Sequence, residues 1–266
     1  MTATMPTPNP GQGEPLLEPA ASGAKKKRES DVGASIWTLA LRRLVRNPVA
    51  ILGAIIVVVF LIIALAAPWL APFPGDATPG RDLIRPTYIP GPSPEFPLGL
   101  DRFGGDMLSK LIWGARSSLV IGVASTLIGL AGGVALGLLS GAFGGWVDSL
   151  TMRFVDIMLS VPSLLLAVSI AAIAGQTPFA IILAIGVVQV PIFARLLRGT
   201  MLAQRGQDYV LAARSLGLSR RTVTMSHILP NSLGPVIVQA TLVLATAVVE
   251  AAALSFLGLG GGRPTA

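Results

Sequence analysis

Residues 49–67 read VAILGAIIVVVFLIIALAA, a stretch without a single charged side chain. A helix of about 20 apolar residues crosses the hydrocarbon core of a bilayer, so this stretch predicts a transmembrane helix. Further apolar stretches lie at about 117–140, 155–174, 178–194 and 234–257. Of the 266 residues, 52% are hydrophobic and 12% are charged, against about 25% charged residues in soluble domains. We therefore predict an all-α polytopic membrane protein with about five spans, rather than one large soluble domain.

The charges predict an orientation in the membrane. Basic residues gather before the first span and again between the fourth and fifth spans, whereas acidic and basic residues balance one another between the first two spans. A basic excess marks the cytoplasmic side, so we expect the amino terminus in the cytoplasm. Nucleic-acid binding is the rival explanation of the net charge of +7, and it is disfavoured because the basic residues flank membrane spans. There are no cysteines, which excludes disulfides and thiolate metal sites.

The segments outside the core differ in composition. Residues 1–33 are rich in Pro, Gly, Ser and charge and predict a disordered cytoplasmic tail. Residues 34–48 predict an amphipathic helix at the membrane interface, and residues 49–67 are the first span. Prolines recur through residues 68–116, so we expect an external, turn-rich segment in which Asp106 caps the next helix. Residues 258–266 form a short tail.

Residues 117–257 predict the transmembrane core. The second span carries glycines at near four-residue spacing, which lets helix backbones approach closely and places this span inside a bundle. The third span contains Pro162, and residues 141–153 (GAFGGWVDSLTMR) predict the turn before it. Glu250 lies in the fifth span, where an ionisable residue either faces a transport pathway or packs between helices. Its neighbours in the sequence favour neither alternative.

The polar loop at residues 205–230 lies between two of these spans. Residues 208–231 read DYVLAARSLGLSRRTVTMSHILPN. Asp208 predicts a helix N-cap, Gly217 a left-handed helix end, and Ser219 the cap of a second helix that Pro230 interrupts. Ala212, Ala213 and Leu216 predict a small-sided surface that fits a groove of another protein. The alternative is a merely amphipathic loop on the membrane face.

Three motifs resemble those of a known family. Residues 211–231 (LAARSLGLSRRTVTMSHILPN) are similar to the EAA loop of ABC-transporter permease subunits, with Leu211 in place of the usual glutamate. Residues 97–119 (PLGLDRFGGDMLSKLIWGARSSL) resemble the outer-loop motif of the second permease in dipeptide, oligopeptide and nickel importers, with Gly105 where arginine is usual. EAAALSFLGLG, at residues 250–260, resembles the end of the fifth span in that branch. The resemblance covers residues 40–260 and implies a type I, MetI-like permease of the dipeptide transport permease C branch.

This resemblance implies a mechanical role and a set of partners. The loop would be a coupling helix that docks on a separate ATPase subunit, through Asp208, Tyr209, Leu211, Ala212, Ala213, Arg214, Leu216 and Gly217. The chain has no G-x-x-x-x-G-K-[ST] phosphate loop, so it is expected to be non-catalytic and to bind no cofactor, while partner ATPases use ATP and Mg²⁺. The expected partners are a homologous permease subunit in a heterodimer, two ATPase subunits or domains, an extracytoplasmic substrate-binding protein and the lipid bilayer, with no nucleic acid.

The resemblance also leaves alternatives open. It favours short peptides as the substrate, with nickel chelates or haem as the other possibilities. An ion-coupled secondary transporter is the rival class, but it would normally show internal repeats and several intramembrane charges. Similar permeases carry a sixth span after SFLGLG, whereas this sequence stops at GGRPTA. We therefore expect five spans, a sixth helix that is missing, and an external carboxyl terminus.

Overall fold

The computed structural model describes residues 45–85, 88–175 and 177–259. The predicted tail at 1–33 and most of the predicted interfacial helix at 34–48 lie outside these residues. The chain divides into two units, Met1–Val58 and Val59–Ala266. In the first unit, the Asn47 side chain accepts hydrogen bonds from the amides of Val49 and Ala50, at 3.0 and 3.4 Å. These bonds cap the start of helix α3, Pro48–Leu70.

The described part of the chain contains helices and no named strand. The elements after α3 are η1 (Arg81–Leu83), α4 (Met107–Phe143), α5 (Gly145–Ser160), α6 (Ser163–Ala174), α7 (Pro178–Arg205), α8 (Asp208–Ser215), α9 (Arg220–Thr222), the π-helical η2 (Val223–Ile228) and α10 (Leu229–Phe256). Four of the described helices are long and apolar enough to cross a membrane, or five spans result if α5 and α6 form one broken span. The all-α fold with about five spans is therefore confirmed.

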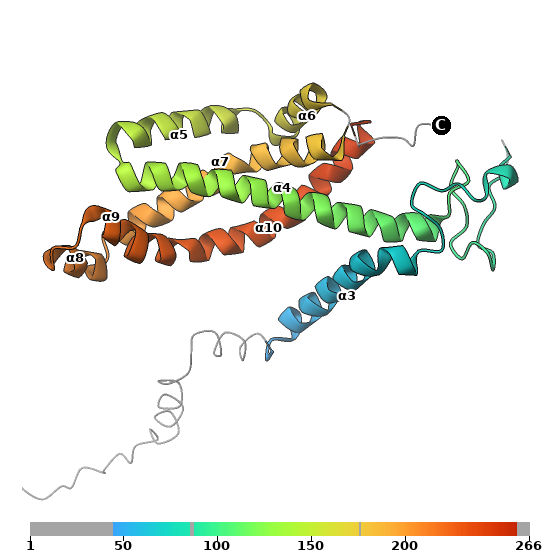
Figure 1. Ribbon diagram of the computed structural model, residues 1–266, viewed down its shortest axis with the longest axis horizontal. Helices are drawn as coiled ribbons and strands as arrows, with labels where there is room; N and C mark the ends of the chain where they lie inside the picture. The colour runs from blue at the N-terminus through green and yellow to red at the C-terminus, as the bar shows by residue number, and fades with distance from the viewer. Residues whose placement is uncertain (1–44, 86–87, 176, 260–266) are drawn as a thin grey trace, which may run out of the picture. The chain divides into compact units, whose positions relative to one another are not determined.

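Helices α4, α7 and α10 pack against one another, with α10 crossing α4 in the view of Figure 1, and α5 and α6 also pack against α7. The closest approach is between α4 and α7. A Cβ atom at Gly133 of α4 would lie 2.3 Å from Phe193 Cβ and 2.7 Å from the Val190 carbonyl oxygen of α7. Gly137 similarly approaches Ala194. The predicted close approach of the helix backbones is confirmed, because no side chain fits on these glycines. The prediction that the second span lies inside the bundle is wrong: 28% of its most apolar stretch is buried, against 61% for α7, against which α4, α5, α6 and α10 all pack.

The third span is not the single helix expected at 155–174. Helix α5 begins at Gly145 and α6 ends at Ala174, with a bend of 92° between them. Proline has no amide hydrogen and keeps the preceding residue extended, and Val161 accordingly has φ −90° and ψ 130°. The predicted turn at 141–153 is also much shorter, because Gly144 and Gly145, both with positive φ, reverse the chain at once.

The fourth and fifth spans differ from the prediction at the ends that α8 and α9 connect. Helix α7 continues past the expected end at 194 to Arg205, so arginines that were expected in the loop lie on the helix. Pro230 does not interrupt the chain before the fifth span. It lies in the first turn of α10, directly after the π-helical η2, and single π-helical turns of this kind occur inside α-helices. The π-helical turn before it keeps the backbone helical, so Arg220–Phe256 is continuous.

The proline-rich segment is shorter than the predicted 68–116. Helix α3 continues to Leu70 and α4 begins at Met107. The described residues between them, 71–85 and 88–106, form turns, η1 and two isolated bridges. Asp106 caps α4 as predicted, because its Oδ2 accepts hydrogen bonds from the amide and hydroxyl of Ser109, at 2.8 and 2.6 Å. In the same loop, Asp101 accepts the amides of Phe103 and Gly105, both at 2.8 Å, and pairs with Lys110.

Because α4 and α7 are in close contact, one added methyl group between them should lower the stability of the protein. Gly133→Ala places a Cβ against Phe193, and overpacking of this kind costs about 1–3 kcal/mol. We expect a lower melting temperature of the detergent-solubilised protein. Gly114→Ala on the same helix is the matched control, because its Cβ would have no neighbour within 4 Å. Its melting temperature should be unchanged or raised, since alanine favours a helix by about 0.5–1 kcal/mol over glycine.

The Asp101 turn predicts a dependence on pH. Burial opposes ionisation of this carboxyl, but Lys110 and the amides of Gly105 and Phe103 outweigh it and lower the pKa of Asp101 below its ordinary value. A lowered pKa stabilises the folded turn above the ordinary carboxyl pKa, and this stabilisation is lost as the pH falls through the lowered value. Protection of the Phe103 and Gly105 amides from hydrogen exchange, corrected for intrinsic rates, should therefore fall in acid.

At neutral pH, Asp101→Asn should already show the low protection that the wild-type turn reaches in acid. Asp82→Asn, which removes an exposed carboxylate from η1, is the control and should keep wild-type protection. Equal protection in the Asp101 variant and the wild type at neutral pH would contradict this account of the turn.

Candidate functional site

Helices α8 and α9 connect α7 to α10 at one end of the helices (Figure 1). Helix α7 ends at Arg205, and α8 begins after Gln207. Asp208 is therefore not the N-cap that the sequence predicted but the first residue of α8, and no side chain caps this helix end. Its carboxylate still favours the positive end of the helix dipole, and Arg214 lies in the last turn where a cation is favourable.

The turn between α8 and α9 follows the prediction. Gly217 has φ +79°, a conformation that residues with a side chain rarely adopt. Its amide donates to the Arg214 carbonyl at 2.9 Å, and the Leu218 amide donates to the Ala213 carbonyl at 3.2 Å. This pattern closes a helix C-terminus. Ser219 then caps α9, since its hydroxyl oxygen accepts the Thr222 amide at 3.2 Å.

Helix α8 has a buried face and an exposed face. Val210 and Ala213 are buried and pack with Phe193, Leu197 and Met201 of α7. Ala213 therefore belongs to the core and not to the predicted contact surface, because helical spacing turns it inward with Val210. The other predicted residues are exposed, and Leu216 is 82% exposed. We call these residues the α8 surface: Asp208, Tyr209, Leu211, Ala212, Arg214, Leu216 and Gly217.

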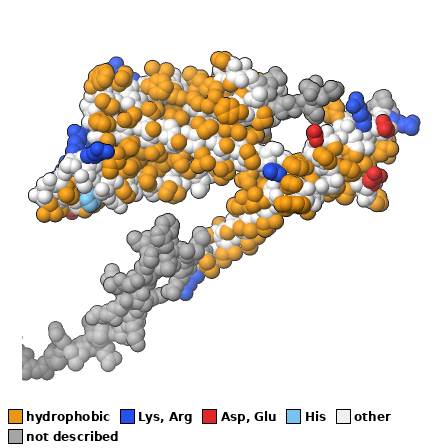
Figure 2. Space-filling model, viewed as in Figure 1, with side chains coloured by type: hydrophobic (Ala, Val, Ile, Leu, Met, Phe, Trp, Pro, Cys, Tyr) orange, Lys and Arg blue, Asp and Glu red, His pale blue; other side chains and the backbone are white. Residues whose placement is uncertain are grey.

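Two arginines fasten this connection to the end of α4. Arg205 donates hydrogen bonds to the Gly141 and Ala142 carbonyls, the latter at 3.1 Å. Arg220 donates to the Ala142 and Phe143 carbonyls, at 3.1 and 2.9 Å. Carbonyls at a helix C-terminus lack partners within the helix and carry its negative dipole, so two cations stabilise the end of α4. Figure 2 shows Lys and Arg gathered at this end of the helices.

The sequence did not predict that these two arginines stabilise the end of α4, because it indicated them only as part of the basic excess that marks the cytoplasmic side. It also missed two ion pairs between α5 and α7. Arg198 binds both carboxylate oxygens of Asp148, at 2.5 and 2.7 Å, and Ser140 of α4 donates to the same carboxylate. Arg195 pairs with Asp156 at 2.5 Å. The partners lie 39 and 50 residues apart in the chain, so no local pattern reveals them.

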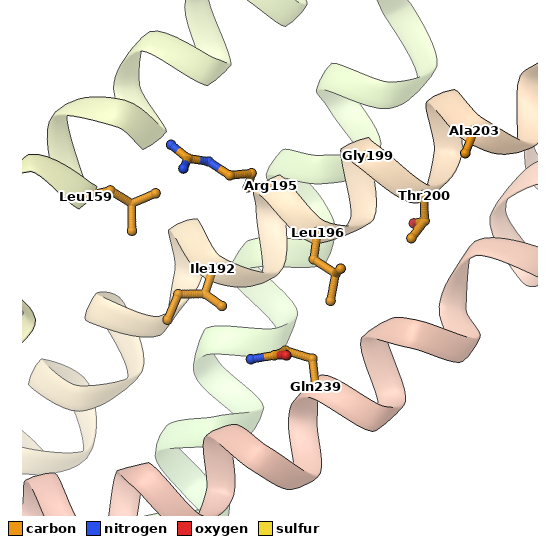
Figure 3. Close-up of a pocket in the computed structure, with 8 residues that line it drawn as sticks. All are labelled: Leu159, Ile192, Arg195, Leu196, Gly199, Thr200, Ala203 and Gln239. Atoms are coloured by element: carbon orange, nitrogen blue, oxygen red, sulfur yellow. The ribbon is translucent and has the colours of Figure 1, made fainter.

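An open groove lies between α5, α7 and α10, with a volume of about 630 Å³. Most of its lining comes from one face of α7, and Figure 3 shows Leu159 of α5 and Gln239 of α10 completing it. Glu250 of α10 is not among the lining residues. Its carboxyl instead interacts with the Ser163 side chain of α6, and Glu250 Oε2 is buried without a hydrogen-bond partner. Its role in a pathway or in packing stays a prediction.

Among the described residues, no three His, Cys, Asp or Glu side chains come together as possible metal ligands. Two known protein families match the sequence of this chain. The inner-membrane component of binding-protein-dependent transport systems matches residues 133–265. The N-terminal transmembrane domain of oligopeptide transport permease C matches residues 35–86. The chain belongs to this permease family.

Several relatives of this permease belong to transport systems whose names state what they transport. It is 40% identical to the dipeptide transport system permease protein DppC of Alkalihalophilus pseudofirmus, over 94% of this chain and 81% of that protein. It is 42% identical to the di/tripeptide permease DppC of Pseudomonas aeruginosa, over 82% and 73%. It is 35% identical to the glutathione permease GsiD of Pectobacterium atrosepticum, over 86% and 74%. A solved structure of the MetNI methionine ABC transporter is 22% identical, with a TM-score of 0.49 over 57% of this chain and 76% of that one.

The resemblance to the second permease of dipeptide importers is thus confirmed. The protein is a multi-pass membrane protein and a transport component of a binding-protein-dependent system. The described side chains make structural contacts between helix ends, and they leave the connection through α8 exposed. The α8 surface and the two arginines behind it therefore define the candidate functional site of the permease.

The arginine contacts predict different roles for two nearby cations. Arg205→Ala removes hydrogen bonds from a charged donor to the end of α4, which is worth about 1.5–3 kcal/mol, so the solubilised permease should melt at a lower temperature. Arg214→Ala is the control, because Arg214 is exposed and makes no ion pair with any described residue. Its stability should change by no more than about 0.5 kcal/mol. Equal melting temperatures of the two variants would contradict the assigned role of Arg205.

Proposed function

We propose that this permease forms half of the translocation pathway for short peptides and couples to a separate ATPase through the α8 surface. One observation carries the docking part of the proposal. An eight-residue helix is anchored by Val210 and Ala213 but leaves Leu216 82% exposed and Leu211 51% exposed. Exposed apolar residues on a short ordered helix are typical of a surface that a partner protein covers.

The anchoring of α8 supports a coupling role. Helix α8 follows α7 directly, and α9 continues through η2 into α10. Arg205 and Arg220 additionally tie both ends of the connection to α4. A displacement of α8 is therefore transmitted to the three long helices α4, α7 and α10, because the connection is held in place by these contacts. Such coupling requires that the ATPase contacts α8 differently in its different nucleotide states.

The remaining partners follow from the family and from the charges. We expect a homologous permease subunit as the other half of a heterodimer, two ATPase subunits that bind ATP and Mg²⁺, and an extracytoplasmic binding protein that delivers the substrate. The basic residues at the α8 and α9 end support a cytoplasmic position for this end of the helices. The same rule supports a cytoplasmic amino terminus.

The names of the relatives support peptides as the substrate class. Two of them are permeases of dipeptide or di/tripeptide systems, and a third belongs to a glutathione system. Glutathione is itself a tripeptide, so all three names describe small peptides. Free α-ammonium and α-carboxylate groups are common to most such substrates.

The docking surface predicts a separation between folding and association. Leu216→Asp should leave the melting temperature of the permease unchanged, because the side chain is 82% exposed. Copurification with the ATPase subunits should fall at least tenfold, since a charge would enter an apolar contact. Arg221→Gln is the control, because Arg221 is exposed on α9 and lies outside the α8 surface. Unchanged copurification of the Leu216 variant would contradict docking through α8.

The substrate prediction is tested by transport. A strain that lacks this permease should not accumulate radiolabelled dialanine, and restoring the chain should return uptake to the wild-type rate. The Leu216→Asp chain should fail to restore uptake although it reaches the membrane. Full dialanine uptake in the strain without the permease, with other peptide importers deleted, would exclude the proposed substrate.

A further inference from the structure

The groove between α5, α7 and α10 combines apolar walls with a few polar groups. Its residues from α7 recur along one helix face, from Ile192 through Gly199 to Ala203. Leu159 and Ile192 supply apolar area, whereas Thr200 and Gln239 supply a hydroxyl and an amide. Figure 3 shows Arg195 extending from α7 toward α5 at one end of these residues. A volume of about 630 Å³ lies in the range of small-molecule sites, about 300–1,000 Å³.

An exposed ion pair borders this groove at the ends of two predicted spans, with Asp156 at the start of 155–174 and Arg195 just after 178–194. Arg195 pairs with Asp156 of α5 at 2.5 Å, and their side chains are 56% and 62% exposed. At a rise of about 1.5 Å per residue, Arg195 lies roughly 15 Å along α7 from Arg205 and about 26 Å from Pro178. The pair therefore lies about one hydrocarbon thickness from Pro178, at the boundary of the apolar spans, where its charges need not be placed within hydrocarbon. The groove continues from Ile192 to Ala203, past the end of the predicted fourth span.

The pair is well placed to exchange partners. Asp156 lies three residues before Leu159, so both project from the same side of α5, and Leu159 and Arg195 both line the groove. Ion pairs between exposed side chains contribute little stability, so separating this one for a ligand costs little. A ligand with one positive and one negative group can then make two ion pairs in place of one.

We propose that this groove binds short zwitterionic peptides, with Arg195 binding the α-carboxylate and Asp156 the α-ammonium group. Both peptide termini are ionised at neutral pH. Thr200 and Gln239 are the groups available for the peptide bond, and the apolar walls accept side chains without demanding a particular one. The assignment rests on the proposed peptide substrate, and it names the residues of this chain that recognise what all such substrates share.

The absence of cysteine from the chain allows a direct test. Gly199→Cys introduces a thiol in the groove, where an added Cβ has no neighbour within 4 Å. In inside-out membrane vesicles that carry the assembled transporter, a charged, membrane-impermeant thiol reagent should label this cysteine. Dialanine at millimolar concentration should slow labelling at least threefold, whereas N-acetylalanine amide, which has no charge, should not.

Two controls isolate the groove and the ion pair. Ile237→Cys places a thiol on α10 near the height of Gln239, at a residue that is 62% exposed and does not line the groove, and it should stay unlabelled. Asp156→Asn and Arg195→Gln, each combined with Gly199→Cys, should leave labelling intact and abolish protection by dialanine. If the pair only joined α5 to α7, both variants would keep that protection.

The outcomes separate this inference from the proposed function. Dialanine uptake that depends on the permease, together with an unlabelled Gly199→Cys variant, would overturn the groove assignment and leave the transport proposal standing. Equal protection by dialanine and the neutral analogue would overturn recognition of the two termini. Labelling that dialanine slows, in a transporter whose restoration does not return dialanine uptake, would support the site and contradict the substrate proposal.

Discussion

The structure depends on the close contact between α4 and α7. Gly129, Gly133 and Gly137 of α4 meet Gly186, Phe193 and Ala194 of α7 at distances that exclude a side chain on the glycines. Within a bilayer, lipid is as apolar as leucine, so helices associate through close van der Waals packing rather than through hydrophobic exclusion. The glycines make that packing possible, and the other described helices of the second unit are arranged around the resulting pair.

The polar contacts act at the end of this pair that lies next to α8 and α9. Arg205 and Arg220 occupy the carbonyls that α4 cannot satisfy within itself, and Asp148 joins α5 to α7 through Arg198. These side chains replace the water that would otherwise solvate a helix end. They also place α8 on a firm base, with Val210 and Ala213 buried beneath it. A short helix that is anchored to its own protein and exposed on its other face suits the transmission of force from a partner.

The broken third span gives the molecule its groove. Because Pro162 turns the chain by 92° between α5 and α6, α5 lies along α7 without the continuation of a straight helix beside it. The space between α5, α7 and α10 is left open, and the Asp156–Arg195 pair borders it. One proline therefore has consequences for both the shape and the polarity of this face.

The sequence by itself determined the membrane class, the approximate spans, the glycine-rich packing helix, the cap at Asp106 and the turn at Gly217. These features depend on composition, on helical spacing or on the conformational freedom of one residue, all of which are local. The tertiary structure decided that Ala213 is buried, that Pro230 leaves the helix continuous and that Pro162 breaks one. It also brought Arg205, Arg220, Asp148 and Asp156 to partners 39 to 78 residues away. Contacts between helices depend on how the helices pack, and the linear pattern of charges carries no record of that packing.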